Sequence, residues 1–344
     1  MQAAKTRLHA RYLRGKQQAP NGFVGTSYKL FSKARQLGMR FAQRRRSLLL
    51  PTNLNVELTT LCNLHCSYCV HRKMKAFGNM EPKVISKVVK EFASISEQQK
   101  VTLAPVGVGE PLLFSGFFGV LKWFKNVMPN VPIFVITNGI TLNKENCEKV
   151  IKSGIDRFLI SLNFNDKSSY LEYNGVDKYD VVVKNTKIFL KMKGNRNPAT
   201  SIQMLDITSN KPHFQQFVKQ WTPYLNPNDT AALKVCDNWT GTIDRTKFTD
   251  NKPPSRYPCP MLYSMVIINK DGYIFPCCQG MTRGPESALC LGNILDKTIK
   301  QIYAQEDTIW NLRRLHERGL YDGLPCKDCF AWSMVPNIFF TGWN

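Results

Sequence analysis

The stretch "ELTTLCNLHCSYCVHRK", residues 57–73, places Cys62, Cys66 and Cys69 within eight positions. Three thiolates this close together are suitable ligands for a soft metal. Structural zinc sites and iron–sulfur clusters usually take four protein ligands, and the only further candidates in this stretch are two histidines. If the three cysteines hold an iron–sulfur cluster, one iron stays open for a substrate or cofactor. The spacing therefore predicts a metal centre with a free position.

On either side of this stretch, the chain alternates between strand-like apolar runs and segments of helical period. The strand-like runs are residues 54–58, 101–106, 133–137, 157–162, 200–205 and 232–236. The helical segments are residues 81–94, 114–128, 143–153, 179–192 and 212–221. This order implies a parallel sheet with right-handed crossovers, whose working face is at the carboxyl ends of the strands. We therefore expect an α/β fold, a partial (β/α)6 TIM-like barrel, with the cysteine stretch at its mouth.

Residues 62–69, Cys-Asn-Leu-His-Cys-Ser-Tyr-Cys, resemble the signature of the radical S-adenosylmethionine (radical SAM) enzymes. The resemblance implies a 4Fe–4S cluster whose open iron binds the amino and carboxylate groups of S-adenosylmethionine. One electron, from a donor such as flavodoxin or ferredoxin, would then cleave the sulfonium to give a 5′-deoxyadenosyl radical that removes a hydrogen atom from the substrate. The protein would supply placement and exclude water.

Other short stretches follow the predicted strands and agree with this resemblance. Residues 107–111, Gly-Val-Gly-Glu-Pro, are similar to the Gly-Gly-Glu-Pro element of the family, with Val108 in place of a glycine. Carbonyls and a carboxylate there can accept from an ammonium group, and glycine permits close approach. Taken alone, the stretches 137–139 and 161–163 are an ordinary turn and strand end. By resemblance, the cofactor-binding residues are Tyr68, Gly109, Glu110, Asn138, Ser161 and Asn163.

The last hundred residues differ in character from the predicted barrel. Residues 237–260 are polar and rich in proline, which indicates a domain boundary. Residues 269–272, Asn-Lys-Asp-Gly, lie between two alternating runs and predict a hairpin. A complete four-thiolate set surrounds it: Cys259, Cys277, Cys326 and Cys329. Such a set suits either a second, fully ligated iron–sulfur cluster or a zinc ion.

This C-terminal layout resembles the SPASM domain and its shorter twitch form, which hold auxiliary iron–sulfur clusters. The resemblance favours a 4Fe–4S cluster over zinc at the four-thiolate set. The full SPASM pattern has further cysteines beyond Cys329, whereas this chain has none there, so we expect one auxiliary cluster. We place the domains as a basic extension at 1–50, a radical SAM core at 51–236 and an auxiliary-cluster domain at 237–344.

Four cysteines remain outside the two sets. Cys147 falls on the apolar face of a predicted helix and is expected in the core. Cys236, Cys278 and Cys290 are candidate hydrogen-atom donors to a substrate radical, as epimerases of this superfamily require. The alternative for each of these three is a structural role.

The formal net charge of the chain is +22. Residues 1–56 contain twelve Lys or Arg and no Asp or Glu, and Leu30, Ala34, Leu37 and Phe41 follow at helical spacing. This pattern predicts a basic amphipathic helix on an anionic membrane surface or an acidic partner. A solvated helix packed on the barrel and an organelle transit peptide are the alternatives.

The eleven cysteines form an odd set at short spacings, in a sequence without a secretory leader or an apolar run of membrane-spanning length. This combination favours metal ligation in a reducing compartment, which we take to be the cytoplasm.

These features lead to two hypotheses of different classes. The first is a radical SAM oxidoreductase or epimerase that acts on a carbohydrate-like or other polar small molecule, with a peptide substrate as the alternative within that class. The second is a non-catalytic zinc protein that binds nucleic acid, prompted by the net charge. Its weakness is that the basic residues lack the interleaved aromatic side chains of a stacking platform.

Overall fold

The computed structural model describes residues 50–250 and 256–333. Contacts divide the chain into two units, residues 1–49 and residues 50–344, and all the described residues belong to the second unit. The predicted amphipathic helix with Leu30, Ala34, Leu37 and Phe41 lies outside the described residues, so it stays a prediction. Within the described ranges, no helix is long and apolar enough to cross a bilayer.

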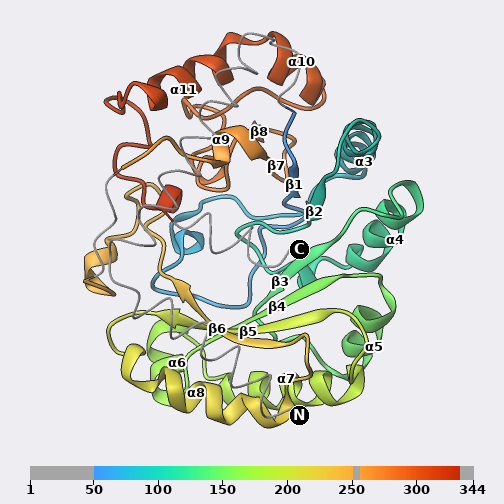
Figure 1. The fold of residues 1–344 in the computed structure, drawn as a ribbon, viewed down its shortest axis with the longest axis vertical. Helices are drawn as coiled ribbons and strands as arrows, with labels where there is room; N and C mark the ends of the chain where they lie inside the picture. Colours follow the sequence, from blue (N-terminus) through green and yellow to red (C-terminus); the bar gives the residue numbers. More distant parts are fainter. Residues whose placement is uncertain (1–49, 251–255, 334–344) are drawn as a thin grey trace. The chain divides into compact units, whose positions relative to one another are not determined.

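Parallel strands form the barrel wall in chain order (Figure 1). They are β1 (Asn53–Val56), β2 (Thr102–Ala104), β3 (Phe134–Thr137), β4 (Arg157–Asn163), β5 (Ala199–Asp206) and β6 (Thr230–Val235). A parallel bridge between Leu103 and Ile133 continues the row from β2 to β3. Because β1 pairs on its other side with a C-terminal strand and not with β6, the barrel stays open. The predicted partial barrel is confirmed.

Helices cover the outer side of these strands (Figure 1). They are α3 (Pro82–Ser96), α4 (Phe117–Val127), α5 (Lys144–Lys152), α6 (Lys167–Asn174), α7 (Tyr179–Lys193) and α8 (Phe214–Trp221). In α3, Pro82 occupies the first turn, where its missing N–H costs nothing. The predicted apolar face of α3 is buried, including Val88 and Phe92, each of which is fully inaccessible. Burying a side chain of this size contributes roughly 1.5–3 kcal/mol.

Helix α6 is the barrel helix that the sequence pattern did not predict. Only Tyr170 and Asn174 of this helix are buried, so it has no apolar stripe of helical period. Its start depends on a local cap instead, in which Asp166 accepts a hydrogen bond from the Ser169 N–H. It ends at Gly175, whose φ of 74° is left-handed.

The C-terminal hairpin extends the barrel sheet. Strand β7 (Met265–Ile268) pairs in parallel with β1, and β8 (Ile274–Phe275) pairs antiparallel with β7. The predicted turn at 269–272 is confirmed, and its Gly272 has a φ of 85°. The hairpin follows the domain boundary that we place at 236/237, but it belongs to the same sheet as β1 of the barrel. That boundary stays a prediction.

The rest of the described chain is built from short elements. The C-terminal helices are α9 (Met261–Ser264), α10 (Ile299–Gln305) and α11 (Asp307–Glu317). Short 3-10 helices are η1 (Val70–Lys73), η2 (Pro111–Leu113), η3 (Lys211–His213), η4 (Thr222–Tyr224), η5 (Arg245–Lys247), η6 (Met281–Arg283) and η7 (Ala331–Ser333). Helix α11 packs against α9 and α10, and so covers the hairpin end of the sheet.

Candidate functional site

The loop after β1 brings together Cys62, Cys66 and Cys69, which we call the loop trio. Burial, with a smaller contribution from the charge of Cys69, raises the pKa of the Cys62 thiol to about 11 and that of the Cys66 thiol to about 12. Burial also raises the pKa of Cys69. Cys69 is therefore close enough to the other two thiols to influence their ionisation. A metal bound there would displace their protons, so its affinity would rise with pH.

The C-terminal end of α6 holds this loop in place. The His65 N–H donates to the Asn174 carbonyl at 3.0 Å, and the Ser67 N–H donates to the Tyr173 carbonyl at 2.8 Å. A methyl group at Gly175 would lie 3.0 Å from the His65 side chain, so the glycine lets the helix end approach the loop. The free carbonyls at a helix end thus become the anchor of the trio.

Asn174 is a site residue that the sequence analysis missed. Its Oδ1 accepts from the Tyr68 hydroxyl at 2.6 Å and from the Cys66 thiol at 3.3 Å. Its side chain is fully buried, and its Nδ2 has no hydrogen-bond partner among the described residues. The available signal was an Asn-Gly pair, which indicates a helix end but no chemistry.

The segment after β2 approaches the loop trio through Gly109. A methyl group on Gly109 would lie 2.3 Å from the Thr59 carbonyl oxygen, so no larger residue fits without movement. The buried Glu110 carboxylate accepts from the Thr137 hydroxyl and the Asn138 N–H, both at 2.7 Å. Burial raises its pKa to about 7. Glu110 therefore joins the segment after β2 to the end of β3. A hydrogen bond from the ammonium group of a bound cofactor would come in addition to these two.

The other predicted cofactor-binding residues also lie at the carboxyl ends of the strands. Asn138 donates through its Nδ2 to Asn63 Oδ1 at 2.7 Å, and Asn163 donates to the Tyr68 hydroxyl at 2.8 Å. Ser161 is half-buried on β4. Asn163 has a left-handed φ of 68° where the β4–β5 register shifts. Its Oδ1 is buried without a partner among the described residues, and so is available to a ligand.

The four C-terminal thiols line one enclosed cavity, and we call them the auxiliary set: Cys259, Cys277, Cys326 and Cys329. Burial, and then the neighbouring thiols, raise the pKa of Cys277 well above its usual range. Burial raises the pKa of Cys259 to about 12 and that of Cys326 to about 11, while the Arg256 charge lowers both. The predicted four-thiolate set thus converges in space.

Arg256 and His316 also line the auxiliary cavity. The Arg256 guanidinium donates to the Lys327 carbonyl at 2.6 Å and to the Cys326 carbonyl, and lies 3.8 Å from the centre of the Tyr321 ring. The Cys259 N–H donates to His316 Nδ1 at 3.4 Å. Burial lowers the pKa of His316 to about 4, so its ring is neutral at physiological pH.

A strained turn at residues 237–241 joins the end of β6 to the auxiliary cavity. Trp239, Thr240 and Gly241 have φ values of 48°, 54° and 80°. The Arg283 guanidinium holds this turn by donating to the Thr240 hydroxyl at 3.0 Å and to its carbonyl at 2.8 Å. Left-handed non-glycine residues persist only where their surroundings enforce them, and they concentrate at functional sites.

Asp237 opens this turn and lies between the two thiol sets. Its carboxylate accepts from the Gln279 side-chain amide, and its charge raises the pKa of Cys69, Cys278 and Cys329. Burial raises the pKa of Asp237 itself. The charge of one carboxylate at the end of β6 therefore influences a thiol of each set, and the sequence analysis did not single this residue out.

The three candidate hydrogen donors have different surroundings. Cys236 is buried, with its Sγ 3.7 Å from the Asp237 carbonyl oxygen, and Asp237 also influences Cys278. The Cys290 Sγ lies 3.8 Å from the Gly292 carbonyl oxygen and does not line the auxiliary cavity. The structure thus places Cys236 and Cys278 beside the same carboxylate, and Cys290 elsewhere.

The donor chemistry fits the cofactors that the thiol sets imply. The loop trio offers three thiols and the auxiliary set four, and the orphaned Asn163 Oδ1 adds a buried acceptor at the barrel mouth. In residues 50–250 and 256–333, no three His, Cys, Asp or Glu side chains are gathered as around one metal ion.

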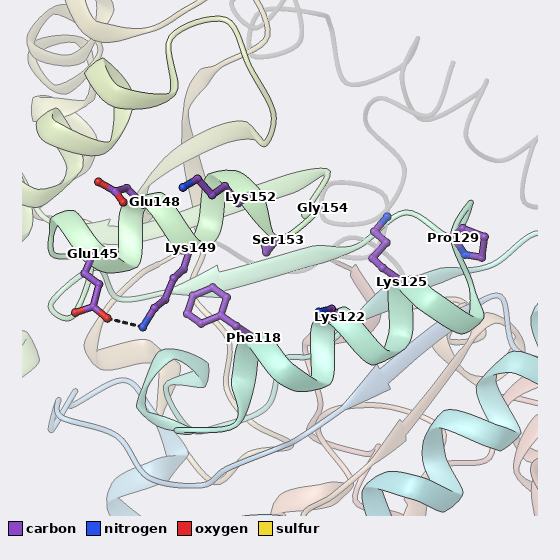
Figure 2. A pocket seen from close by; sticks show the side chains of 10 residues that line it. All are labelled: Phe118, Lys122, Lys125, Pro129, Glu145, Glu148, Lys149, Lys152, Ser153 and Gly154. Atoms are coloured by element: carbon purple, nitrogen blue, oxygen red, sulfur yellow. Dashed lines mark hydrogen bonds and ion pairs between the residues drawn. The ribbon is translucent and has the colours of Figure 1, made fainter.

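A larger pocket, of about 680 Å³, lies between α4 and α5 on the outside of the barrel (Figure 2). Its lining comes mainly from lysines, including Lys122 and Lys152, with Phe118 at one end. An ion pair between Glu145 and Lys149, 2.6 Å apart, spans part of it. No cysteine lines this pocket, so its size does not make it the site of the predicted chemistry.

Comparison with known proteins agrees with these features. Residues 56–219 match the model of the radical SAM superfamily, and residues 259–330 match that of the SPASM iron–sulfur cluster-binding domain. A probable GTP 3′,8-cyclase of Pyrococcus abyssi is 34% identical over 42% of this chain and 46% of its own length. The chain thus spans about half the length of this curated relative.

Two longer similarities cover more than three quarters of the chain. A cysteine-type anaerobic sulfatase-maturating enzyme of Clostridium novyi is 24% identical over 78% of this chain and 82% of the relative. The structure of Streptococcus suis SuiB bound to the precursor peptide SuiA has a TM-score of 0.61, with 15% identity, and covers 83% of this chain and 72% of SuiB.

The two matched domains imply 4Fe–4S clusters and S-adenosylmethionine as the cofactors. They agree with the thiol sets in position, because the loop trio lies in the first matched segment and the auxiliary set in the second. Residues 56–219 are thus a domain of the radical S-adenosylmethionine superfamily, and residues 259–330 are a SPASM iron–sulfur cluster-binding domain.

Proposed function

We propose that the protein is a radical SAM enzyme that removes a hydrogen atom from a carbohydrate-like or other polar small molecule and oxidises or epimerises it. The loop trio would hold one 4Fe–4S cluster with an open iron, and the auxiliary set would hold a second, closed one. Bound there, the first cluster and S-adenosylmethionine would supply the 5′-deoxyadenosyl radical.

The observation that carries this proposal is the position of Asp237. Its charge raises the pKa of Cys69 of the loop trio and of Cys329 of the auxiliary set. The Phe330 N–H, next to Cys329, donates to the side chain of Asn238, next to Asp237, at 2.9 Å. A substrate beside Asp237 would therefore be near a thiol of each set. Lys234, on β6, also influences Cys69 and Asp237. Opposite charges at the end of β6 are suited to a polar substrate.

Oxidation of an alcohol removes a proton and an electron in addition to the hydrogen atom. The cluster that the auxiliary set would hold would accept the electron. Asp237 would accept the proton, because its raised pKa makes the carboxylate a stronger base. Epimerisation would instead need a thiol that returns a hydrogen atom, and Cys236 and Cys278 are the thiols beside Asp237. In D2O, epimerisation would put deuterium on the substrate carbon, whereas oxidation would give a product two hydrogens lighter.

Anaerobic reconstitution tests the enzyme class. We expect about eight irons per wild-type chain and about four in the Cys62/Cys66/Cys69→Ala variant. With dithionite in place of the protein electron donor, wild type should convert S-adenosylmethionine to 5′-deoxyadenosine, and the triple variant should fall to the protein-free rate. An iron-free wild type, or equal 5′-deoxyadenosine from both proteins, would contradict the proposal.

A peptide substrate is the second candidate, and the comparisons favour it. The similar Clostridium novyi protein is a sulfatase-maturating enzyme, and SuiB was solved with a precursor peptide. Panels of polyols and amino sugars, and of Ser- or Cys-containing peptides, should be compared for stimulation of 5′-deoxyadenosine formation. Stimulation by peptides alone, lost on deleting residues 1–50, would replace the small-molecule proposal with the peptide one.

The nucleic-acid-binding alternative loses its support, because the radical SAM superfamily is a family of enzymes. A role of residues 1–50 at an anionic membrane or acidic partner stays a prediction that depends on charge alone.

A further inference from the structure

His316 is a buried polar side chain in the wall of the auxiliary cavity. It lies on α11, is 2% exposed, and lines the same cavity as the four thiols of the auxiliary set. It is neither a cysteine nor part of the Asp237 turn, so the proposed function gives it no role. A buried polar group in such a place requires a partner.

The hydrogen bonding of His316 fixes where its ring carries the proton. Nδ1 accepts the Cys259 N–H at 3.4 Å, so Nδ1 is unprotonated. A neutral imidazole with an accepting Nδ1 has its hydrogen on Nε2. This Nε2–H is buried and has no hydrogen-bond acceptor among the described residues.

Neighbouring groups hold the ring in this orientation. The Tyr321 ring packs edge-on against it with centroids 4.9 Å apart, and the Tyr321 hydroxyl donates to the His316 carbonyl at 3.3 Å. The Nε2–H is thus a fixed donor without an acceptor, in a cavity lined by four thiols. A group held by those thiols would supply the missing acceptor.

We infer that His316 Nε2–H donates a hydrogen bond to a sulfur of the cluster held by the auxiliary set, and thereby raises the reduction potential of that cluster. This inference rests on the proposed function, since it requires an iron–sulfur cluster in the auxiliary cavity. Reduction adds one electron and no proton, so the reduced cluster is the more negative state. A donor beside the sulfur stabilises that state more than the oxidised one.

Two substitutions of His316 test the roles of the two ring nitrogens separately. His316→Asn keeps an acceptor near the position of Nδ1 for the Cys259 N–H but has no donor at the position of Nε2. His316→Gln carries an amide N–H that reaches the position of Nε2. Both are made in the Cys62/Cys66/Cys69→Ala background, so that only the auxiliary cluster is observed.

Anaerobic titration with dithionite then gives the midpoint potential of the auxiliary cluster. We expect His316→Asn to shift the oxidised-to-reduced ratio at fixed potential by up to tenfold toward the oxidised form, which is ~59 mV for one electron. His316→Gln should stay near the parent. The matched control is Trp310→Phe, on the same helix. Like His316 Nε2, the indole N–H of Trp310 is buried and has no hydrogen-bond partner among the described residues, but Trp310 does not line the cavity. It should not shift the midpoint.

A second measurement needs no substitution at His316. In the Cys62/Cys66/Cys69→Ala protein labelled with ¹⁵N-histidine, pulsed EPR of the reduced auxiliary cluster should show a weak histidine nitrogen coupling. Iron analysis separates the two failures. An auxiliary set that holds no iron would overturn the proposed cluster itself. A loaded cluster with no histidine coupling, or with the same midpoint in His316→Asn as in its parent, would overturn the role of His316.

Discussion

The loop trio and the auxiliary set are two ways of gathering thiols. The trio comes from eight consecutive positions between β1 and η1, whereas the auxiliary set comes from segments around residues 259, 277 and 326–329. Closing the auxiliary set therefore requires the hairpin and the chain beyond α11 to pack first, which costs more loop-closure entropy. The trio offers three thiols to a partner molecule, and the auxiliary set closes on itself.

The charges around the two sets differ as well. The carboxylate of Glu110 raises the pKa of Cys62, and Asp237 raises that of Cys69, although Lys234 lowers it. The guanidinium of Arg256 lowers the pKa of Cys259 and Cys326. Positive charge beside Cys259 and Cys326 stabilises thiolates and a bound cluster that gains electrons, and only Cys329 of the auxiliary set has its pKa raised by Asp237. The trio has both carboxylates and a lysine near it, where a polar ligand would lie.

The largest effect is expected from a substitution that removes one thiol of the auxiliary set and leaves the loop trio intact. Cys329→Ala should lower the iron content from about eight to about four per chain, because the auxiliary cavity offers no cofactor, such as the S-adenosylmethionine proposed at the loop trio, to replace the lost thiolate on the fourth iron. Formation of 5′-deoxyadenosine without substrate should persist, since the trio is untouched. The control Cys147→Ala changes a buried cysteine outside both sets and should keep all the iron. Loss of S-adenosylmethionine cleavage in Cys329→Ala would show that the two sets are not independent.

A smaller effect tests whether Gly109 is needed because its backbone lies close to the loop that carries the trio. Gly109→Ala would place a methyl group 2.3 Å from the Thr59 carbonyl, and overpacking of this kind costs roughly 1–3 kcal/mol. Gly119→Ala, in α4, meets nothing within 4 Å and should stabilise the chain by roughly 0.5–1 kcal/mol. Urea unfolding and iron content report both changes. Equal behaviour of the two variants would remove close approach as the reason for Gly109.

An effect of comparable size is a pH dependence at the junction of barrel and hairpin. Burial raises the pKa of Glu57 to about 7 from 4.5, and its carboxylate accepts from the Val108 N–H at 2.9 Å. The unfolded carboxyl ionises first, so this stability is complete below pH 4.5. It is lost as the pH rises to about 7, by roughly 3 kcal/mol.

Glu110 has the same raised pKa and should contribute a similar loss, so Glu57→Gln should remove about half of the combined pH dependence of the two carboxyl groups. Urea unfolding of the reconstituted protein at pH 5 and pH 8 measures it. An unchanged difference between the two pH values in Glu57→Gln would show that Glu57 does not titrate as its burial implies.

Several parts of the fold follow from local sequence signals. The β-strands of the barrel and the helix α3 are where the apolar periods predicted them, since each pattern matches the repeat of its own element. Helix α6 has no such period, because it buries only Tyr170 and Asn174. Its importance lies in the carbonyls at its end, which anchor the trio, and backbone groups leave no trace in composition.

The sequence by itself determined the two thiol sets, the barrel and the hairpin turn, because metal spacing, hydrophobic period and turn chemistry are local properties. The tertiary structure decided which polar groups meet these thiols. Asn174, Asp237 and His316 come from different elements, and each is near a thiol only after the barrel and the C-terminal helices have packed. Burial then sets their hydrogen bonding and pKa values, and burial belongs to the fold.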